Sequence, residues 1–405
     1  MESCVLLLRT CVLIGTLSTT AMAQAQEPAS INYGGFRITP VVNTELAYVD
    51  NVTYVRDPES IIESYRLTVA PQVEFYTENN FSRQRLVYRL ENAQYYSSSE
   101  DNYTDHFLNY SASAFFTDTQ SVLLRVSLEE GHEARGQGFT AGRADILTST
   151  DNFTDIFISG EYMLGSSRST IFATGLLSYR DLDYDLDITP LFNRDREELS
   201  AGLSAKYRFS PFARIALDIE RDDIQYAADS TNFTTLDSTR DSILIGVDWD
   251  ASAFLSGTAQ IGYEERDFVS PQRKDFYGVD WYVDVTWQPT SIMSLTLLSD
   301  FDTRENNALG DFIDTTNSRL VWKQKWLERL QSTVGLGYAR QEFQGLDPTI
   351  EYREDSTTSV NFAVDYQFRR WLNFTTFYNY STRSSNLLSI DFNRRVLGLT
   401  IKVTL

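Results

Sequence analysis

The sequence has few of the residues that build cross-linked or metal-binding proteins. Its 405 residues include two cysteines, Cys4 and Cys11, and two histidines, His106 and His132. Because no cysteine follows residue 11, the rest of the chain forms neither a disulfide nor a cysteine-based metal site. Two histidines without cysteine also disfavour a transition-metal site. The sequence therefore predicts no metal site and no cofactor.

Basic residues are also scarce relative to acidic ones. The chain has 35 Lys and Arg against 56 Asp and Glu, a formal net charge of -21. A strongly acidic chain is repelled by phosphate backbones and anionic surfaces. Nucleic acid is therefore excluded as an expected partner.

Long apolar runs are missing beyond the N-terminus. The first residues, "MESCVLLLRTCVLIGTLSTTAMAQ", contain an apolar run followed by Ala21-Met22-Ala23, a small-residue cleavage site of a secretory signal. A membrane anchor is disfavoured, because the run is well short of about 20 residues. We expect residues 1–23 to be a cleaved signal peptide, 24–35 a short periplasmic segment and 36–405 one further domain.

In the rest of the chain, apolar and polar residues alternate along the sequence. In "SPFARIALDIERDDIQYA", residues 210–227, Ala213, Ile215 and Leu217 share one parity, whereas Arg214 and Asp218 share the other. Such a period of two indicates a strand with one apolar and one charged face. The same pattern recurs from residue 36 to the end of the chain.

Short turns and longer polar loops separate the alternating segments. The tight turns are expected at residues 77–81, 117–121, 165–169, 210–214, 251–255, 288–292, 326–330 and 368–372. They delimit 18 strands of about 12 to 15 residues, whereas soluble strands usually have about 5 or 6. The sequence therefore predicts an all-β fold, a transmembrane antiparallel β-barrel of about 18 strands in the bacterial outer membrane, with short periplasmic turns and longer extracellular loops.

Aromatic residues cluster beside the expected tight turns. A ring of aromatics at a membrane interface is typical of such barrels. We expect this girdle to contain Tyr76, Phe81, Phe115, Phe116, Phe209, Phe212, Phe254, Trp287, Trp326, Phe368 and Trp371.

Parity also predicts which charged residues line the interior. A basic residue at the lipid-facing midplane costs about 2 to 4 kcal/mol, so the charged parity is expected to face inward. The predicted pore-lining residues are Arg83, Arg85, Arg89, Glu91, Arg125, Glu129, Arg214, Asp218, Glu220, Asp280, Asp284, Arg319, Lys323 and Lys325. Two interpretations stay open: opposed charges create a transverse field that orients solute, or they form neutral ion-pair networks that stiffen the wall.

The longest loop, residues 133–150, is rich in glycine. It contains Arg135, Gly136, Gly138, Gly142 and Arg143, and its glycines permit tight backbone turns. One hypothesis is a constriction that folds into the pore with both arginines facing the lumen. The alternative is a mobile extracellular loop.

Catalysis and calcium binding are disfavoured. His132 has acidic neighbours in sequence, but no motif ties a serine to it, and His106 is expected at the rim of a strand. The acidic stretch "DLDYDLD", residues 181–187, lacks the glycine and ligand spacing of a calcium loop. We therefore expect the protein not to be an enzyme.

Several short motifs resemble the β-barrel porin 2 family of outer-membrane proteins. The opening strand, "FRITPVVNTELAYVDNVTY", ends in Asp50-Asn51; a Tyr-x-Asp-His element follows at residues 103–106, and Arg135-Gly136 comes after the next strand. Motifs carry the resemblance over residues 36–140. Over the remainder, the resemblance lies in the recurring order of strand, tight turn, strand and longer loop. One departure is the terminal Leu405, where such barrels commonly end in Phe or Trp.

The resemblance implies a barrel encoded with systems for exopolysaccharide synthesis and export. It suggests a channel assisting export of an extracellular polysaccharide. The implied partners are outer-membrane lipid and lipopolysaccharide, the polysaccharide itself, periplasmic polysaccharide-export proteins and the barrel-assembly machinery. A general or substrate-specific uptake porin and a closed structural or adhesion barrel are the alternatives.

Overall fold

The computed structural model describes residues 30–166, 169–185, 194–227, 235–252, 254–305, 310–345 and 352–404. The predicted signal peptide, residues 24–29 of the predicted periplasmic segment and Leu405 lie outside these residues, as do parts of the 165–169 turn and of the 181–187 stretch. No helix in the described part is long and apolar enough to cross a membrane.

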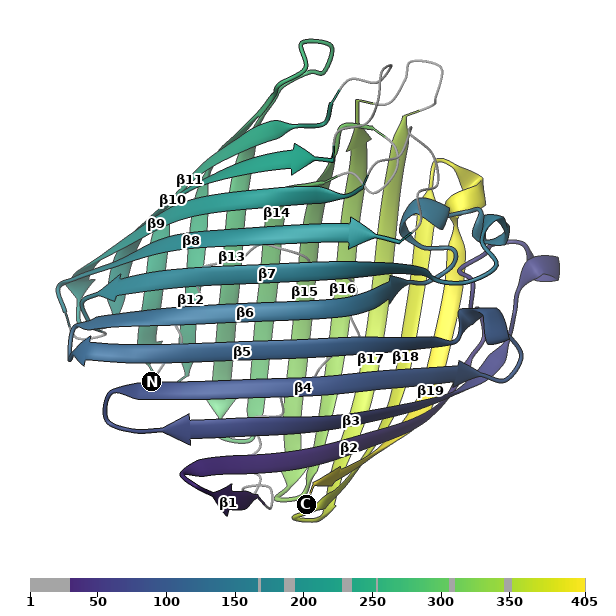
Figure 1. Cartoon of the computed structure of the whole chain (residues 1–405), viewed down its shortest axis with the longest axis horizontal. Coiled ribbons are helices and arrows are strands. Elements are labelled where there is room, and N and C mark those ends of the chain that lie inside the picture. Colours follow the sequence, from purple (N-terminus) through teal and green to yellow (C-terminus); the bar gives the residue numbers. More distant parts are fainter. Residues whose placement is uncertain are drawn as a thin grey trace.

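The described residues form nineteen antiparallel strands (Figure 1). They are β1 (Ile31–Tyr33), β2 (Phe36–Val49), β3 (Ser64–Glu78), β4 (Ser82–Tyr95), β5 (Tyr103–Thr117), β6 (Gln120–Glu133), β7 (Asp151–Leu164), β8 (Ile171–Tyr184), β9 (Arg196–Ser210), β10 (Ala213–Tyr226), β11 (Ser238–Ser252), β12 (Leu255–Phe268), β13 (Phe276–Thr290), β14 (Met293–Glu305), β15 (Phe312–Leu327), β16 (Leu330–Gln344), β17 (Arg353–Arg369), β18 (Leu372–Ser385) and β19 (Phe392–Thr404). Short 3₁₀ turns lie in the loops: η1 (Pro58–Ser60), η2 (Ser99–Asp101), η3 (Gly138–Thr140), η4 (Ala144–Ile146) and η5 (Leu388–Ile390).

Strands β2 to β19 close into a ring of 18. Each strand pairs with its sequence neighbours, and β19 pairs with β2 to complete the barrel. All eight predicted tight turns fall between strands, and the longer connections gather at the opposite end (Figure 1). The predicted fold is thus confirmed.

The extra strand β1 was not predicted. It lies in the segment expected to precede the barrel and pairs with the start of β2. Gly34 and Gly35 join the two strands with φ angles of +57° and +85°. Glycine adopts this conformation without steric cost, and two such residues form the tight turn of a hairpin.

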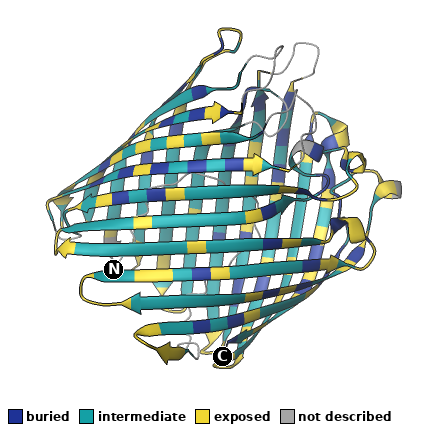
Figure 2. Cartoon of the chain, viewed as in Figure 1, coloured by how far each residue is buried: buried dark blue, intermediate teal, exposed yellow. Residues whose placement is uncertain are grey.

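Burial follows the geometry of a membrane wall and not that of a globular core. Figure 2 shows buried positions scattered along the strands, and among the described residues the cluster of buried hydrophobic side chains comprises Ala47, Val49, Val52 and Val396. Large apolar side chains are instead exposed along the outer face, including Ile215 and Ile219 of β10. This distribution is expected when the apolar face meets lipid.

The aromatic girdle is present at the short-turn end with two corrections. Its exposed members are Phe81, Phe116, Phe209, Phe212, Phe254, Trp287, Trp326, Phe368 and Trp371. Tyr76 and Phe115 are not part of it, because their rings lie beneath the guanidinium groups of Arg37 and Arg83. Their parity places them on the opposite face from the exposed aromatics.

Candidate functional site: the charged inner face

Contacts that skip a strand identify the inner face of the barrel. Lys206 of β9 binds Asp248 of β11 at 2.5 Å over the intervening β10. Arg240 of β11 binds Asp302 of β14 at 2.9 Å over two intervening strands, β12 and β13. Side chains converge over an intervening strand on the concave side of a curved sheet, so the face that carries these pairs is the inner one.

The strand registers place all fourteen predicted pore-lining residues on this same face. The register can be followed from Asp222 through Arg240 and Arg266 to β13 and on to β15, and around the ring in the other direction from β9 to β4. The residues do not form one site. They divide into a half-exposed region on β2–β6, a buried corner on β9–β15 and a row of cations on β15.

On β2–β5, arginine side chains lie over aromatic rings. Arg37 lies 4.7 Å from the ring centre of Tyr76, Arg83 lies 5.5 Å from that of Phe115, and Arg89 lies 4.0 Å from that of Phe107. At this distance an arginine is attracted to the face of the ring. These pairs, with Arg66 and Tyr95 and the nearby Tyr103, are called here the aromatic–arginine track.

The track runs along the wall from the short turns to the long loops. Arg66 lies 5.8 Å from the ring centre of Tyr95 near the loop end, where the hydroxyl of Tyr103 donates to Glu91 at 3.0 Å. Each strand contributes residues at alternate positions, so the track stays on the inner face.

Acidic partners hold the arginines of the track in place. Arg85 binds Glu74 at 2.7 Å and Arg89 binds Glu91 at 2.6 Å, while Arg83 binds Glu78. The side chains of Arg83, Arg85 and Arg89 remain 34%, 52% and 34% exposed. They are therefore oriented by their partners and still accessible from the interior.

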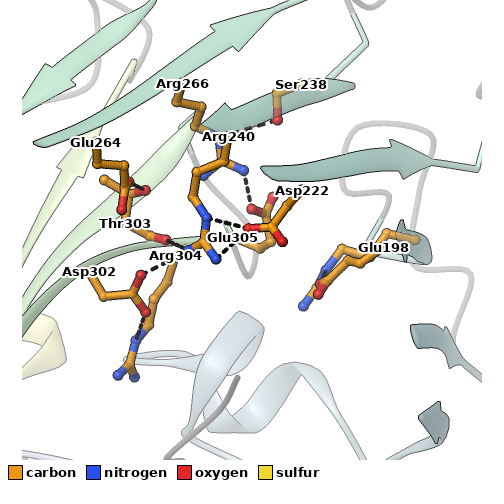
Figure 3. A network of polar contacts seen from close by, with 11 residues as sticks. Glu198, Asp222, Ser238, Arg240, Glu264, Arg266, Asp302, Thr303, Arg304 and Glu305 are labelled. Atoms are coloured by element: carbon orange, nitrogen blue, oxygen red, sulfur yellow. Dashed lines mark hydrogen bonds and ion pairs between the residues drawn. The ribbon is translucent and has the colours of Figure 1, made fainter. Parts of the chain in front are cut away.

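The opposite region is a buried corner in which two parts of the wall meet. Figure 3 shows Arg240 between Asp222 and Asp302, with distances of 2.6 and 2.9 Å. Arg266 pairs with Glu305, which also accepts a hydrogen bond from Tyr226. We call this set, together with Glu264 and Thr303, the corner network.

The corner network is closed to solute. Arg266 is fully buried, and Glu264, Asp302 and Thr303 are almost so. A buried charge must be paired and hydrogen-bonded to be tolerated, and here each arginine has carboxylate partners. In this corner the ion pairs join strands to one another.

The other predicted residues, on β6, β10 and β13, differ in their partners. Asp218 accepts a hydrogen bond from Gln260, and Arg125 on β6 pairs with Glu161. Asp280 is fully buried, whereas Asp284 is partly exposed. Arg214 and Glu220 of β10 and Glu129 of β6 share their face.

Three cations on β15 form the remaining group. Within the described residues, Arg319, Lys323 and Lys325 have no ion-pair partner within 4 Å. They occupy alternate positions of one strand, and their side chains are half-buried. The inner face therefore has a positively charged row that is not neutralised locally.

The glycine-rich loop is packed against other loops. Arg135 donates two hydrogen bonds to Asp101, at 2.9 and 2.6 Å, and is 7% exposed. This bonding raises the pKa of the Arg135 guanidinium above its usual value. Arg135 therefore anchors the loop to η2, whereas the constriction hypothesis placed its side chain in the lumen. Arg143 is exposed.

Glycines let the loop approach its neighbours closely. Gly136, at φ +85°, lies so near the carbonyl oxygen of Thr53 that a Cβ would be 1.8 Å from it. A Cβ at Gly142 would lie 2.8 Å from the carbonyl oxygen of Ser389, and one at Gly138 would lie 1.7 Å from the carboxylate of Glu133. The loop thus contacts the β2–β3 and β18–β19 loops, which belong to distant parts of the chain.

The motif residues of the N-terminal half converge near this loop. Asn51 is buried and donates to the carbonyl oxygens of Val55 and Asn393, joining the first loop to β19. His132 hydrogen-bonds Asp105 at 2.9 Å and stacks on Tyr103, with ring centres 3.8 Å apart.

The second histidine, His106, hydrogen-bonds the hydroxyl of Tyr88 at 2.8 Å. Both histidines thus contact acidic or aromatic side chains. In the described part of the chain, no group of three or more His, Cys, Asp or Glu side chains is arranged to hold a metal ion.

Sequence reasoning identified the charges but missed their aromatic partners. Tyr76 and Phe115 alternate in phase with arginines on neighbouring strands, which is the signal that would have placed them inside. Tyr226, which donates to Glu305 in the corner network, is 8% exposed, so its ring is not available to a solute.

Comparisons agree with this architecture. A family model described as "Putative beta-barrel porin 2" matches residues 24–405. A BenF-like porin from Pseudomonas fluorescens Pf-5 has a similar structure, with a TM-score of 0.51, 10% identity, and coverage of 91% of this chain and 99% of that one. OpdQ from Pseudomonas aeruginosa gives a TM-score of 0.50 at 10% identity, covering 91% and 97%. No curated protein sequence matches significantly.

Proposed function

The chain belongs to the β-barrel porin 2 family and is a porin-type β-barrel of the bacterial outer membrane; from this premise we propose that it is a passive channel for carbohydrate. The observation that carries the proposal is the aromatic–arginine track. A barrel of 16 to 18 strands is wide enough for an aqueous channel. The track gives one wall of that channel a surface suited to sugars.

The chemistry of the track matches a carbohydrate chain. Sugar rings pack their C–H faces on aromatic rings, and their hydroxyl groups hydrogen-bond to arginines and carboxylates. Arg89, Phe107 and Glu91 present these groups within one patch. A series of weak binding sites lets a solute pass from one site to the next, because each site binds the solute weakly enough to release it.

The proposed direction is export of an extracellular polysaccharide, and it rests on the family resemblance. An uptake porin is the alternative, supported by the likeness in fold to a BenF-like porin. Disrupting the gene distinguishes the two. Export predicts loss of surface polysaccharide with retention of polymer in the periplasm, whereas uptake predicts unchanged polymer and slower growth on the transported sugar.

Liposome swelling tests the track itself. The full chain is reconstituted and exposed to linear neutral oligosaccharides of increasing length. We expect Phe107→Ala to slow the entry of the longer sugars while leaving the entry of a monosaccharide unchanged. The control is Phe209→Ala, which removes an exposed outer-face ring and should leave both rates unchanged. Equal rates for Phe107→Ala and the unmodified chain would overturn the role of the track.

A further inference from the structure

The inner face of β15 carries positive charge that no carboxylate neutralises. Arg319 lies near the middle of the strand, and Lys323 and Lys325 follow it on the same face. Within the described residues, none of the three forms an ion pair. The arginines of the corner network, by contrast, are held by carboxylates. The row on β15 can therefore attract an anion into the interior.

The adjoining strands do not supply the missing negative charge. On the inner face of β16–β19, as the structure describes these strands, the acidic side chains are Asp355 and Asp365. Arg353 binds Asp355 at 2.6 Å, and Asp365 accepts a hydrogen bond from Thr375 at 2.6 Å. This wall is thus positively charged, although the chain as a whole is strongly acidic.

Glycines leave space beside the row. Gly337 lies directly across from Arg319 on the inner face of β16, and Gly335 occupies the same face, so neither position raises a side chain between β15 and β17. Ser359 and Asn361 of β17 lean over these glycines: a Cβ at Gly337 would overlap the Ser359 hydroxyl oxygen, and one at Gly335 would lie 3.5 Å from Oδ1 of Asn361. Polar atoms of β17 therefore reach over β16 toward the cations.

The polar groups around the glycines include an acceptor held in place and an unused hydroxyl. Nδ2 of Asn361 donates to Oδ1 of Asn379 at 2.9 Å, so Oδ1 of Asn361 is the atom that faces β16. The Thr333 hydroxyl, directly opposite Lys323 on the inner face, is 2% exposed and has no hydrogen-bond partner. Buried polar groups normally have a partner, so an unbonded hydroxyl here points to a polar ligand or to water.

We propose that the inner face of β15–β17 binds the carboxylate-bearing units of an acidic saccharide, such as a polyuronate. The inference rests on the proposed carbohydrate channel and names the class of its solute. The guanidinium of Arg319 matches a carboxylate with two parallel hydrogen bonds, and Lys323 adds a second positive charge. Ser359 and Asn361 offer a donor and an acceptor to the sugar hydroxyl groups. Strands β15 and β16 lie across the ring from β5 and β6, which belong to the wall of the aromatic–arginine track (Figure 1).

Single-channel block by an acidic and a neutral trisaccharide tests the proposal. The full chain is recorded in planar bilayers of zwitterionic lipid with trigalacturonate and, separately, with maltotriose. Block durations are extrapolated to zero voltage, because the applied field also drives a charged probe. Arg319→Gln removes the central charge of the row. The matched control is Lys402→Gln, which removes the same charge from the inner face of β19.

We expect trigalacturonate to block the unmodified channel for about tenfold longer than maltotriose at low salt, because its carboxylates gain charge-assisted hydrogen bonds. Arg319→Gln should abolish this difference and leave the maltotriose blocks unchanged, whereas Lys402→Gln should preserve it. High salt should shorten the trigalacturonate blocks alone, since it screens the charges. Lys323→Gln, which should reduce the difference, replaces Arg319→Gln if that variant does not fold.

The outcomes separate this inference from the proposed function. Blocks of equal duration by the two sugars, or a difference that persists in Arg319→Gln, would overturn the acidic-saccharide site and leave the carbohydrate channel standing. Blocks by trigalacturonate alone, lost in Arg319→Gln, would support the site. An open channel that neither sugar blocks would contradict both proposals.

Discussion

Arg240 of β11 and Asp302 of β14 form an ion pair at 2.9 Å, although β12 and β13 separate their strands along the wall. The same guanidinium also binds Asp222 on β10. One arginine thus connects three strands in a buried corner. This arrangement supports the stiffening interpretation of the inner charges for β9–β15.

Replacing Arg240 should strongly destabilise the barrel. Arg240→Met leaves two buried carboxylates without their cation, and breaking a buried pair in this way costs about 3 to 5 kcal/mol. The measurement is the midpoint of urea unfolding in lipid vesicles, followed by tryptophan fluorescence.

The control for this prediction lies one ladder position away. Arg221 and Asp241 pair across the same two strands at 3.1 Å, but their side chains are 62% and 44% exposed. Exposed pairs contribute about 0 to 1 kcal/mol, so Arg221→Met should barely move the midpoint. Similar shifts for both variants would contradict the buried role of Arg240.

A methyl group at Gly136 should disrupt the loop assembly. Gly136→Ala places a Cβ against the carbonyl of Thr53 and forces alanine to a positive φ, so the 134–150 loop should separate from the first loop. Faster protease cleavage within residues 134–150 is the expected result. Gly160→Ala, at a position where a Cβ meets nothing within 4 Å, should be cleaved like the unmodified chain.

Removing the cation that anchors the same loop should act similarly. Arg135→Gln loses the charged bonds to Asp101, whereas Arg56→Gln loses only an exposed pair with Asp391 at 3.9 Å. We expect increased loop cleavage for the first variant alone, because only there is a buried anchor of the loop lost. Unchanged conductance after deletion of residues 136–146 would exclude any constriction by this loop.

The cations of β15 should influence ion selectivity. Neutralising Lys323 and Lys325 with glutamine removes positive charge from the inner face, so the reversal potential in a salt gradient should shift toward cation selectivity. Arg329→Gln, in the exposed turn after β15, should leave the potential unchanged. An unchanged reversal potential would show that these lysines do not face the conducting space.

Much of this fold could be predicted because a membrane wall enforces a period of two. Ile215 and Asp218 cannot exchange faces without a large cost in lipid, so parity alone assigns them. Tight turns such as residues 368–372 are set by local sequence and were located correctly. Strand β1 was missed, although Gly34-Gly35 signals a hairpin.

The ion-pair partners could not be predicted from periodicity. Alternation places Arg240 and Asp302 on one face, but it does not determine how sharply the wall bends. Gly246 and Gly262 lie where a Cβ would clash with the neighbouring strand, which fits a tight corner at β11–β12. The bend brings distant strands together, and no local pattern in β14 predicts that its end turns inward.

Single-channel recording of the full chain in planar bilayers tests the central claim most directly. We predict stepwise ion conductance that a linear oligosaccharide interrupts with brief blocks, and shorter blocks after Phe107→Ala. A reconstituted barrel with no conductance would contradict a channel function, and conductance that no oligosaccharide interrupts would contradict a carbohydrate-binding wall.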